Sequence, residues 1–314
     1  MSYGPRMPFF PEAATEDQFE ALTNEQLRPG VAALLAELGL TDRTAVRFDD
    51  GSLPVYAVGD DLVLKLFPPV HLSELGTEAG VLRALDGRLP IPTPRLDRTG
   101  EFDGWGYVLM SRLAGEALSG VWPNLTDEDK EAVAQQLGEA LATLHRTPAP
   151  DIGPADWPEF LAARRAKAVE QQRRAGLAEE WLAQIPGFLA EVDLGTPSPV
   201  LLHTEVMRDH LLVQRGADGW ALTGLFDFEP AMRGAPEYEL VGVGIFVAGG
   251  DRAFFRRVLL AYGYTPEQLD ADFARRCLAY TLLHVYSNLP WYLKVMPEPE
   301  QPTLNALAQR WFAC

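Results

Sequence analysis

Two stretches decide the fold: HTEVMRDHLLV at residues 203–213 and GLFDFEPAMRGAPEYEL at residues 224–240. Each combines a carboxylate with a short apolar run, because Glu205 precedes one run and Asp227 ends the other. Short apolar runs bounded by polar residues and glycine are typical of strands, so we expect both acids at strand ends. Carboxylate oxygens are preferred ligands of hard cations, so the pair predicts an Mg²⁺–phosphate site. Either acid alone would be equally consistent with a turn residue.

A lysine and a glutamate lie upstream of this pair. Lys65 stands in the apolar run LVLKLF at residues 62–67, and Glu78 follows in the next segment. A charge among apolar residues is costly to bury unless it is paired, so Glu78 is the expected partner. Taken alone, Lys65 also fits a solvated lysine on an edge strand. The lysine, the glutamate and the two later acids together match what phosphoryl transfer requires: a cation on the phosphates and oxygen ligands for a metal.

The N-terminal part of the chain has the pattern of a small antiparallel sheet with one long helix. Asp-Gly and Gly-Asp pairs separate its first apolar runs, which is typical of hairpins. Residues 15–39 carry helical spacing interrupted at Pro29 and Gly30, which predicts two short helices. The expected strands lie at 44–48, 54–58, 62–67 and 106–113, and the expected helix at 72–86.

The remainder is mainly helical in pattern. Helices are expected at 127–146, twice within 156–193 and again over 251–312, with two short strands at 211–214 and 221–227. Strands give way to helices near residues 113–118. We therefore expect an α+β, two-lobed fold, with a small β-rich N-lobe over residues 1–113 and a larger, mainly helical C-lobe over residues 114–314.

Composition narrows the possible partners and the compartment. The formal net charge is −17, which disfavours nucleic acid and is compatible with a cationic ligand. The two cysteines, Cys277 and Cys314, form no disulfide or zinc pattern, which fits a reducing cytoplasm. No apolar run reaches the roughly 20 residues of a membrane helix, and the N-terminus lacks the apolar core of a signal peptide. We expect a cytoplasmic protein that binds neither membrane nor nucleic acid; the oligomeric state stays open.

These motifs resemble those of the aminoglycoside phosphotransferase family, which shares the protein-kinase fold. That family has H-G-D-x-x-x-x-N before a strand, D-F-G or D-F-x after a second strand, and then G-D-P-x-Y-D-L. This chain has HTEVMRDH, DFE and GAPEYEL in that order. The resemblance extends over residues 45–245 through VLKLF, TEAGVLRAL, GYVLMSRLAGEAL and LGEALATLHR. The segments resemble those of hygromycin-type members more than those of kanamycin-type members.

The resemblance implies an O-phosphotransferase that moves the γ-phosphate of ATP or GTP, with Mg²⁺, onto a hydroxyl of a small cationic molecule such as an aminoglycoside antibiotic. Lys65 would bind the α- and β-phosphates with Glu78 as its partner, and Glu205 would orient or deprotonate the acceptor hydroxyl. The other implied positions are Asp227 and His210 for the metal, Gly51 and Ser52 for the loop over the nucleotide, the backbone from Met110 to Arg112 for adenine, and His203 and Glu239 for structural support.

Further acids suggest an acceptor-binding wall. Glu229 and Glu237 follow Asp227 closely and would bind amino groups of the acceptor. An ordinary solvated face explains them equally well. Trp291, Tyr292 and Trp311 could stack on a sugar ring, but their helical spacing favours core positions.

Two departures from the family pattern open alternatives. Glu205 replaces the catalytic aspartate and is one methylene longer, and a displacement of about 1 Å can cost about a hundredfold in rate. His210 replaces the metal-binding asparagine; because imidazole is a poor Mg²⁺ ligand, Mn²⁺ or a neighbouring oxygen from Asp209 or Glu229 is an alternative. One alternative is therefore a kinase-fold binding protein with weakened catalysis. Another is an Fe(II) enzyme with a two-histidine, one-carboxylate site from His203, Glu205 and His284.

Overall fold

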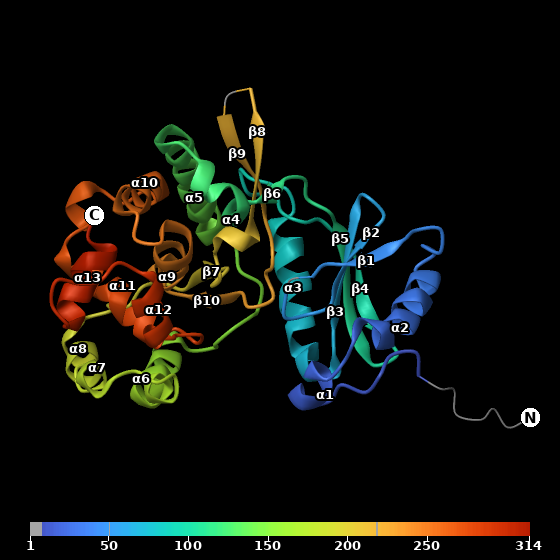
Figure 1. The fold of residues 1–314 in the computed structure, drawn as a ribbon, viewed down its shortest axis with the longest axis horizontal. Helices are drawn as coiled ribbons and strands as arrows, with labels where there is room; N and C mark the ends of the chain where they lie inside the picture. Colours follow the sequence, from blue (N-terminus) through green and yellow to red (C-terminus); the bar gives the residue numbers. More distant parts are fainter. Residues whose placement is uncertain (1–7, 50, 218) are drawn as a thin grey trace, which may run out of the picture. The chain divides into compact units, whose positions relative to one another are not determined.

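The computed structural model describes residues 8–49, 51–217 and 219–314. The chain forms two compact units (Figure 1). The small unit comprises Met1–Asp86, Thr93–Leu113 and Asp227–Pro230. The large unit comprises Gly87–Pro92, Ala114–Phe226 and Ala231–Cys314. Asp227–Pro230 thus belongs to the small unit although it lies far along the chain.

The small unit is built on a five-stranded antiparallel sheet in the order β1-β2-β3-β5-β4. The helices α2 and α3 accompany it, and α3 contacts β3, β4 and β5. The bounds are β1 (Ala45–Arg47), β2 (Val55–Val58), β3 (Leu62–Phe67), β4 (Leu96–Phe102), β5 (Trp105–Ser111), α1 (Glu16–Glu20), α2 (Asn24–Glu37), η1 (Pro69–His71) and α3 (Leu72–Leu85).

The alternation of side chains along β3 positions the lysine. Leu64 and Leu66 are fully buried in a core cluster that also contains Leu27 and Leu34 of α2. Since successive side chains of a strand point to opposite faces, Lys65 points away from that cluster. It meets Glu78 of α3 on the other face.

The N-terminal helices differ from the prediction in where they break. The chain interrupts its helix at residues 21–23, and Pro29 lies inside α2. Thr23 and Gln26 form a capping box that begins α2 there. Gly30 does not end the helix: it makes room for the ring of Phe10, which an added Cβ would approach to 2.2 Å. The prediction of a break at Pro29-Gly30 was therefore wrong.

The large unit is mainly helical. Helix α5 packs against α10, and α11 packs against α9 and α13. Residues 156–193 hold three helices instead of the two expected. The bounds are α4 (Leu118–Val121), η2 (Trp122–Asn124), α5 (Asp127–Arg146), α6 (Trp157–Arg174), α7 (Glu179–Leu182), α8 (Ile185–Glu191), α9 (Pro236–Gly242), η4 (a π-helical turn, Val243–Ala248), α10 (Arg252–Tyr262), η5 (Pro266–Gln268), α11 (Ala271–Leu283), α12 (Leu289–Val295) and α13 (Leu304–Phe312).

Two small antiparallel sheets of the large unit hold the loop that carries Glu205. One sheet has the order β6-β8-β9 and the other pairs β10 with β7. Residues 203–210 connect β7 to β8, and the short helix η3 (Arg208–His210) ends this connection. The strand bounds are β6 (Glu116–Ala117), β7 (Val200–Leu202), β8 (Leu211–Gly216), β9 (Gly219–Leu225) and β10 (Met232–Gly234). We call residues 203–210 the 203–210 loop.

Over the part of the chain that the structure describes, no helix combines the length and the apolar character needed to cross a lipid bilayer.

Candidate active site

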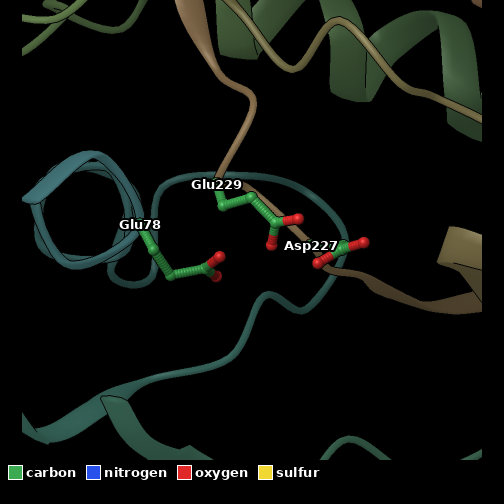
Figure 2. A group of neighbouring side chains, drawn as sticks. All are labelled: Glu78, Asp227 and Glu229. Atoms are coloured by element: carbon green, nitrogen blue, oxygen red, sulfur yellow. The ribbon is translucent and has the colours of Figure 1, made fainter. Parts of the chain in front are cut away.

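Lys65 lies at the centre of a buried charged cluster in the small unit. Its side chain is 4% exposed, and its Nζ atom lies 3.0 Å from Glu78 Oε2 and 2.5 Å from Asp227 Oδ1. Glu229 makes a third ion pair with the same ammonium group. Figure 2 shows the carboxylates of Glu78, Asp227 and Glu229 turned toward one another. The sequence predicted the contact of Lys65 with Glu78; for Glu229 it predicted a contact with the acceptor or, alternatively, an oxygen ligand for the metal, but no pair with Lys65.

The charges of this cluster perturb one another. Burial acts to lower the pKa of Lys65, but the nearby carboxylates of Glu78 and Asp227 outweigh it, so this pKa lies above its ordinary value. Burial raises the pKa of the Glu78 carboxyl, even though Lys65 opposes the shift. Glu78 Oε1 also accepts a hydrogen bond from the backbone N–H of Phe228 at 3.4 Å. Each carboxylate oxygen of Glu78 therefore has a partner, Lys65 for Oε2 and Phe228 for Oε1.

The same three carboxylates have the chemistry of a divalent-cation site. Ligand atoms of Glu78, Asp227 and Glu229 all lie within 4.8 Å of one another. One lysine faces three carboxylates, so when all are ionised two negative charges are uncompensated. Oxygen donors in this number suit Mg²⁺ or Mn²⁺ better than soft metals. The residues of the small unit therefore fit a hard divalent cation.

In the large unit, hydrogen bonds of His203 set the 203–210 loop. His203 Nε2 lies 2.8 Å from the carbonyl oxygen of Phe226, and its Nδ1 lies 3.3 Å from the backbone N–H of Glu205. A carbonyl oxygen only accepts, so Nε2 carries the proton and Nδ1 accepts from Glu205. His203 thus ties the backbone of Glu205 to the residue that precedes Asp227 in the chain, and the Glu205 side chain is half-buried.

A buried carboxylate holds the start of the loop. Glu239 of α9 is fully buried, and its oxygens accept hydrogen bonds from the backbone N–H groups of His203 at 2.5 Å and Thr204 at 2.8 Å. His145 Nε2 lies 3.6 Å from Glu239, and Tyr262 hydrogen-bonds the other ring nitrogen of His145 at 2.8 Å. Burial acts to raise the pKa of Glu239, but His145 and the backbone of His203 outweigh it and lower this pKa. The sequence gave no sign of His145 in this role.

The far end of the loop is held by His210 and Arg208. His210 Nδ1 lies 2.8 Å from the backbone oxygen of Glu205; a carbonyl oxygen only accepts, so Nδ1 carries a proton and donates. Arg208 Nε donates to the carbonyl of Val247 at 2.8 Å, and its guanidinium lies over Trp122, 3.7 Å from the ring centroid. Burial lowers the pKa of Arg208 to about 10. Arg208 anchors the loop on η4, a contact that no motif indicated.

Two residues, one in each unit, have left-handed backbone. Thr204 has φ +72° and Asp227 has φ +75°. Aspartate adopts this region several-fold more often than most residues, whereas a β-branched threonine there is a true outlier. Such conformations cost about 1–3 kcal/mol each and persist only where their surroundings hold them. At Thr204, the bond from its N–H to Glu239 supplies part of that restraint.

The residues expected at the nucleotide lie in the small unit with their backbones partly engaged. Gly51 and Ser52 are exposed in the β1–β2 turn, where Gly51 has φ +114°, a conformation that only glycine adopts readily. Met110 pairs with Val63 in the sheet, and the Arg112 side chain lies over Phe48. The N–H groups of residues 111 and 112 donate to the carbonyls of Arg95 and Asp61. Those two donors would have to leave these bonds to meet adenine.

The expected acceptor-binding acids already have partners. Glu229 binds Lys65, and Glu237 forms a bidentate pair with Arg276, with N···O distances of 2.9–3.1 Å. Either acid would meet an amino group of the acceptor only by sharing or leaving that pair.

The aromatic residues are only partly core. Tyr292 and Trp311 are buried as expected, but Trp291 is 44% exposed, so its expected core position was wrong. Phe246 stacks on the Trp291 ring, with centroids 5.9 Å apart. Tyr292, next to Trp291, lies close enough to Glu205 for that carboxylate to act on its pKa, which burial chiefly raises, to about 12.

The Fe(II) alternative finds no support in the arrangement of its three residues. Among the described residues, the group of at least three side chains that could hold a metal is Glu78, Asp227 and Glu229. His203, Glu205 and His284 do not bring their ligand atoms together in such a group. Both ring nitrogens of His203 are accounted for by the backbone contacts of the loop.

Comparison with known proteins identifies the fold. The model of the phosphotransferase enzyme family matches residues 44–274. The solved GDP complex of wild-type aminoglycoside 2'-phosphotransferase-IIIa is 18% identical, with a TM-score of 0.69 over 85% of this chain and 95% of that chain. Macrolide 2'-phosphotransferase MphH from Brachybacterium faecium is 20% identical, with a TM-score of 0.61 over 87% of this chain and 99% of that chain. The predicted α+β, kinase-like fold is confirmed.

A curated relative is similar over a shorter stretch. Lysine-specific demethylase JMJ21 of Arabidopsis thaliana is 22% identical over 205 residues, which is 51% of this chain and 21% of that protein. The match thus spans about a fifth of the demethylase's length.

Proposed function

Because the chain belongs to the phosphotransferase enzyme family, we propose that it transfers the γ-phosphate of ATP or GTP to a hydroxyl of a small cationic molecule such as an aminoglycoside. The observation that carries this proposal is the buried contact of Lys65 with Glu78 and Asp227. Binding a triphosphate requires a positioned ammonium group and oxygen ligands for a divalent cation. The carboxylates around Lys65 meet both needs, because they hold its ammonium group and can bind such a cation.

In this proposal Lys65 donates to oxygens of the α- and β-phosphates, and Glu78 keeps its ammonium in place. Asp227 is the principal metal ligand, with Nε2 of His210 as a second ligand, which favours Mn²⁺ over Mg²⁺ at that position. When bound, the cation would offset negative charge on the phosphate oxygens. Gly51 and Ser52 would cover the nucleotide.

Glu205 is the proposed catalytic carboxylate. The acceptor hydroxyl oxygen forms a bond to the γ-phosphorus while the bond from that phosphorus to the β–γ bridging oxygen breaks. The hydroxyl proton passes to Glu205, and the nucleoside diphosphate leaves. The Glu205 N–H donates to His203, and the Glu205 carbonyl accepts from His210. These two hydrogen bonds fix the backbone from which the carboxylate extends, so the loop can be built for the longer side chain.

Two observations support the class of acceptor. The chain carries a formal net charge of −17, and solved neighbours include a complex with kanamycin, a streptomycin–ATP ternary complex and a macrolide phosphotransferase. The hygromycin-type resemblance of the segments stays a prediction. We therefore propose a cationic, sugar-bearing acceptor and include each of these antibiotic types in the test.

The test incubates the protein with ATP or GTP, Mg²⁺ or Mn²⁺, and hygromycin B, kanamycin, streptomycin or a macrolide, and reads the mass gain of one phosphoryl group. Asp227→Ala should abolish turnover while circular dichroism shows an intact fold. Full activity in that variant would exclude the metal role of Asp227. Glu205→Asp should slow transfer, by up to about a hundredfold if the carboxylate is displaced by about 1 Å. A faster Glu205→Asp variant would mean that the natural chain is compromised.

A second candidate function is nucleotide binding without transfer. The observation that favours it is the double departure at Glu205 and His210 from the family's aspartate and asparagine. Tight nucleotide binding together with no phosphorylated product and no nucleotide hydrolysis across the panel would support this candidate over the transferase.

A further inference from the structure

Glu229 lies against the Lys65 ammonium group, which is the group that would bind a phosphate. Its carboxylate pairs with Lys65, although only 14% of the Glu229 side chain is exposed. A lysine ammonium has three N–H donors. In this structure Lys65 donates hydrogen bonds to Glu78 and Asp227, and Glu229 forms a third ion pair with the same ammonium group. A phosphate oxygen that approaches Lys65 on the side of Glu229 has to displace this carboxylate.

The three carboxylates differ in how firmly they are held. Glu78 is fully buried, and its second oxygen accepts from the Phe228 N–H, so its withdrawal would leave a buried charge and a buried donor without partners. Asp227 has a short side chain on left-handed backbone. Glu229 has the longer and more flexible side chain. Its buried Oε2 forms an ion pair with Lys65 but no hydrogen bond.

We propose that Glu229 is an internal competitor of the nucleotide, occupying the phosphate position on Lys65 until a divalent cation and nucleotide arrive together. Metal-free nucleotide brings only negative charge to a cluster that already has a carboxylate excess, and it must also displace Glu229. Once Lys65 binds the phosphate, Glu229 and Asp227 lose its ammonium group as their positive partner. A cation bound with the nucleotide would replace that positive charge. Glu229 thereby couples nucleotide binding to the metal, and this inference rests on the proposed function only in taking a nucleotide as the ligand.

The experiment measures the affinity of a fluorescent ADP analogue for the wild-type protein and for Glu229→Gln, first in EDTA and then with saturating Mg²⁺. In EDTA, Glu229→Gln should bind at least about tenfold more tightly, the factor expected from one charge-assisted hydrogen bond. With Mg²⁺ the difference should shrink. Glu74→Gln is the matched control. It also removes one negative charge from the small unit, but Glu74 lies on α3 and pairs with His71 instead of Lys65.

A second variant separates position from charge. Glu229→Asp keeps the charge but withdraws the carboxylate by one methylene, so it should also bind ADP more tightly in EDTA if contact with Lys65 is the cause. The inference is overturned if Glu229→Gln binds ADP in EDTA no better than the wild-type protein or Glu74→Gln, or if Glu229→Asp behaves as wild type. If no form binds nucleotide with or without Mg²⁺, the proposed function fails and the inference with it. Equal binding by all forms overturns the inference alone.

Discussion

The carboxylate of Glu239 offers a prediction whose magnitude follows from two hydrogen bonds. It accepts from the N–H groups of His203 and Thr204. Glutamine in its place has one acceptor oxygen, so one buried N–H loses its partner, at a cost of about 1–3 kcal/mol. The remaining bond loses its charge assistance, which costs about 1 kcal/mol. Because the pKa of Glu239 is lowered, folding favours its ionised form, and relief of the buried charge does not cancel these losses. We expect Glu239→Gln to lose at least about 2 kcal/mol of unfolding free energy.

The assay is urea unfolding followed by circular dichroism, with Glu237→Gln as the matched control. Glu237 is on the same helix, but its pair with Arg276 is partly exposed, so its loss should cost less than the loss of Glu239. A carboxyl with a lowered folded-state pKa contributes stability above its unfolded-state pKa and loses it as pH falls through the folded-state value. Glu239→Gln should therefore remove part of the acid sensitivity. A variant as stable as the control, with an unchanged acid profile, would refute this account of the loop.

Three further predictions concern other parts of the molecule. Burial lowers the pKa of His284 from 6.5 to about 4. The folded protein therefore binds this proton less readily than the unfolded chain, and the free energy of unfolding falls by about 2 kcal/mol between pH 8 and pH 5. In urea titrations, His284→Phe should show a smaller difference in unfolding free energy between these two pH values. Lys65→Met should cost about 3–5 kcal/mol in the same titrations, because it leaves carboxylates buried without their cation, whereas Glu78→Gln should cost less because Lys65 keeps two partners. Trp291 has an exposed ring on which a sugar can stack, so Trp291→Ala should raise the KM for the acceptor substrate and leave kcat unchanged, as expected for lost uniform binding. An unchanged KM would place the acceptor elsewhere.

The sequence predicted the elements that have strong periodicity. The expected strand at 62–67 and helix at 127–146 have the observed bounds of β3 and α5. Hairpin signals and alternating apolar residues depend only on neighbouring residues, so tertiary contacts leave the elements that they predict in place. The strand β4 was not predicted, because its sequence, LDRTGEF, is polar and it lies at the edge of the sheet. The short strands β6, β7 and β10 depend on pairing with distant segments.

The candidate site was predictable in its residue types but not in its contacts. Lys65 and Glu78 lie 13 residues apart on adjacent elements, so their pairing follows from local order. Glu229 meets Lys65 across a long stretch of chain, next to Asp227 with its left-handed backbone, and a sequence pattern indicates neither feature. The support of Glu239 by His145 joins helices α9 and α5, and no motif links the two positions.

The small unit is not continuous in the chain, and this affects how it can be synthesised. A ribosome that has made all five strands and α3 has supplied Lys65 with Glu78 only, since Asp227 lies 162 residues further on. The charged cluster of the nascent sheet is therefore incomplete until Asp227–Pro230 has been synthesised. A gene fragment that ends at Leu113 would encode the strands but not the whole unit, and supplying residues 114–314 in trans should be needed to restore it.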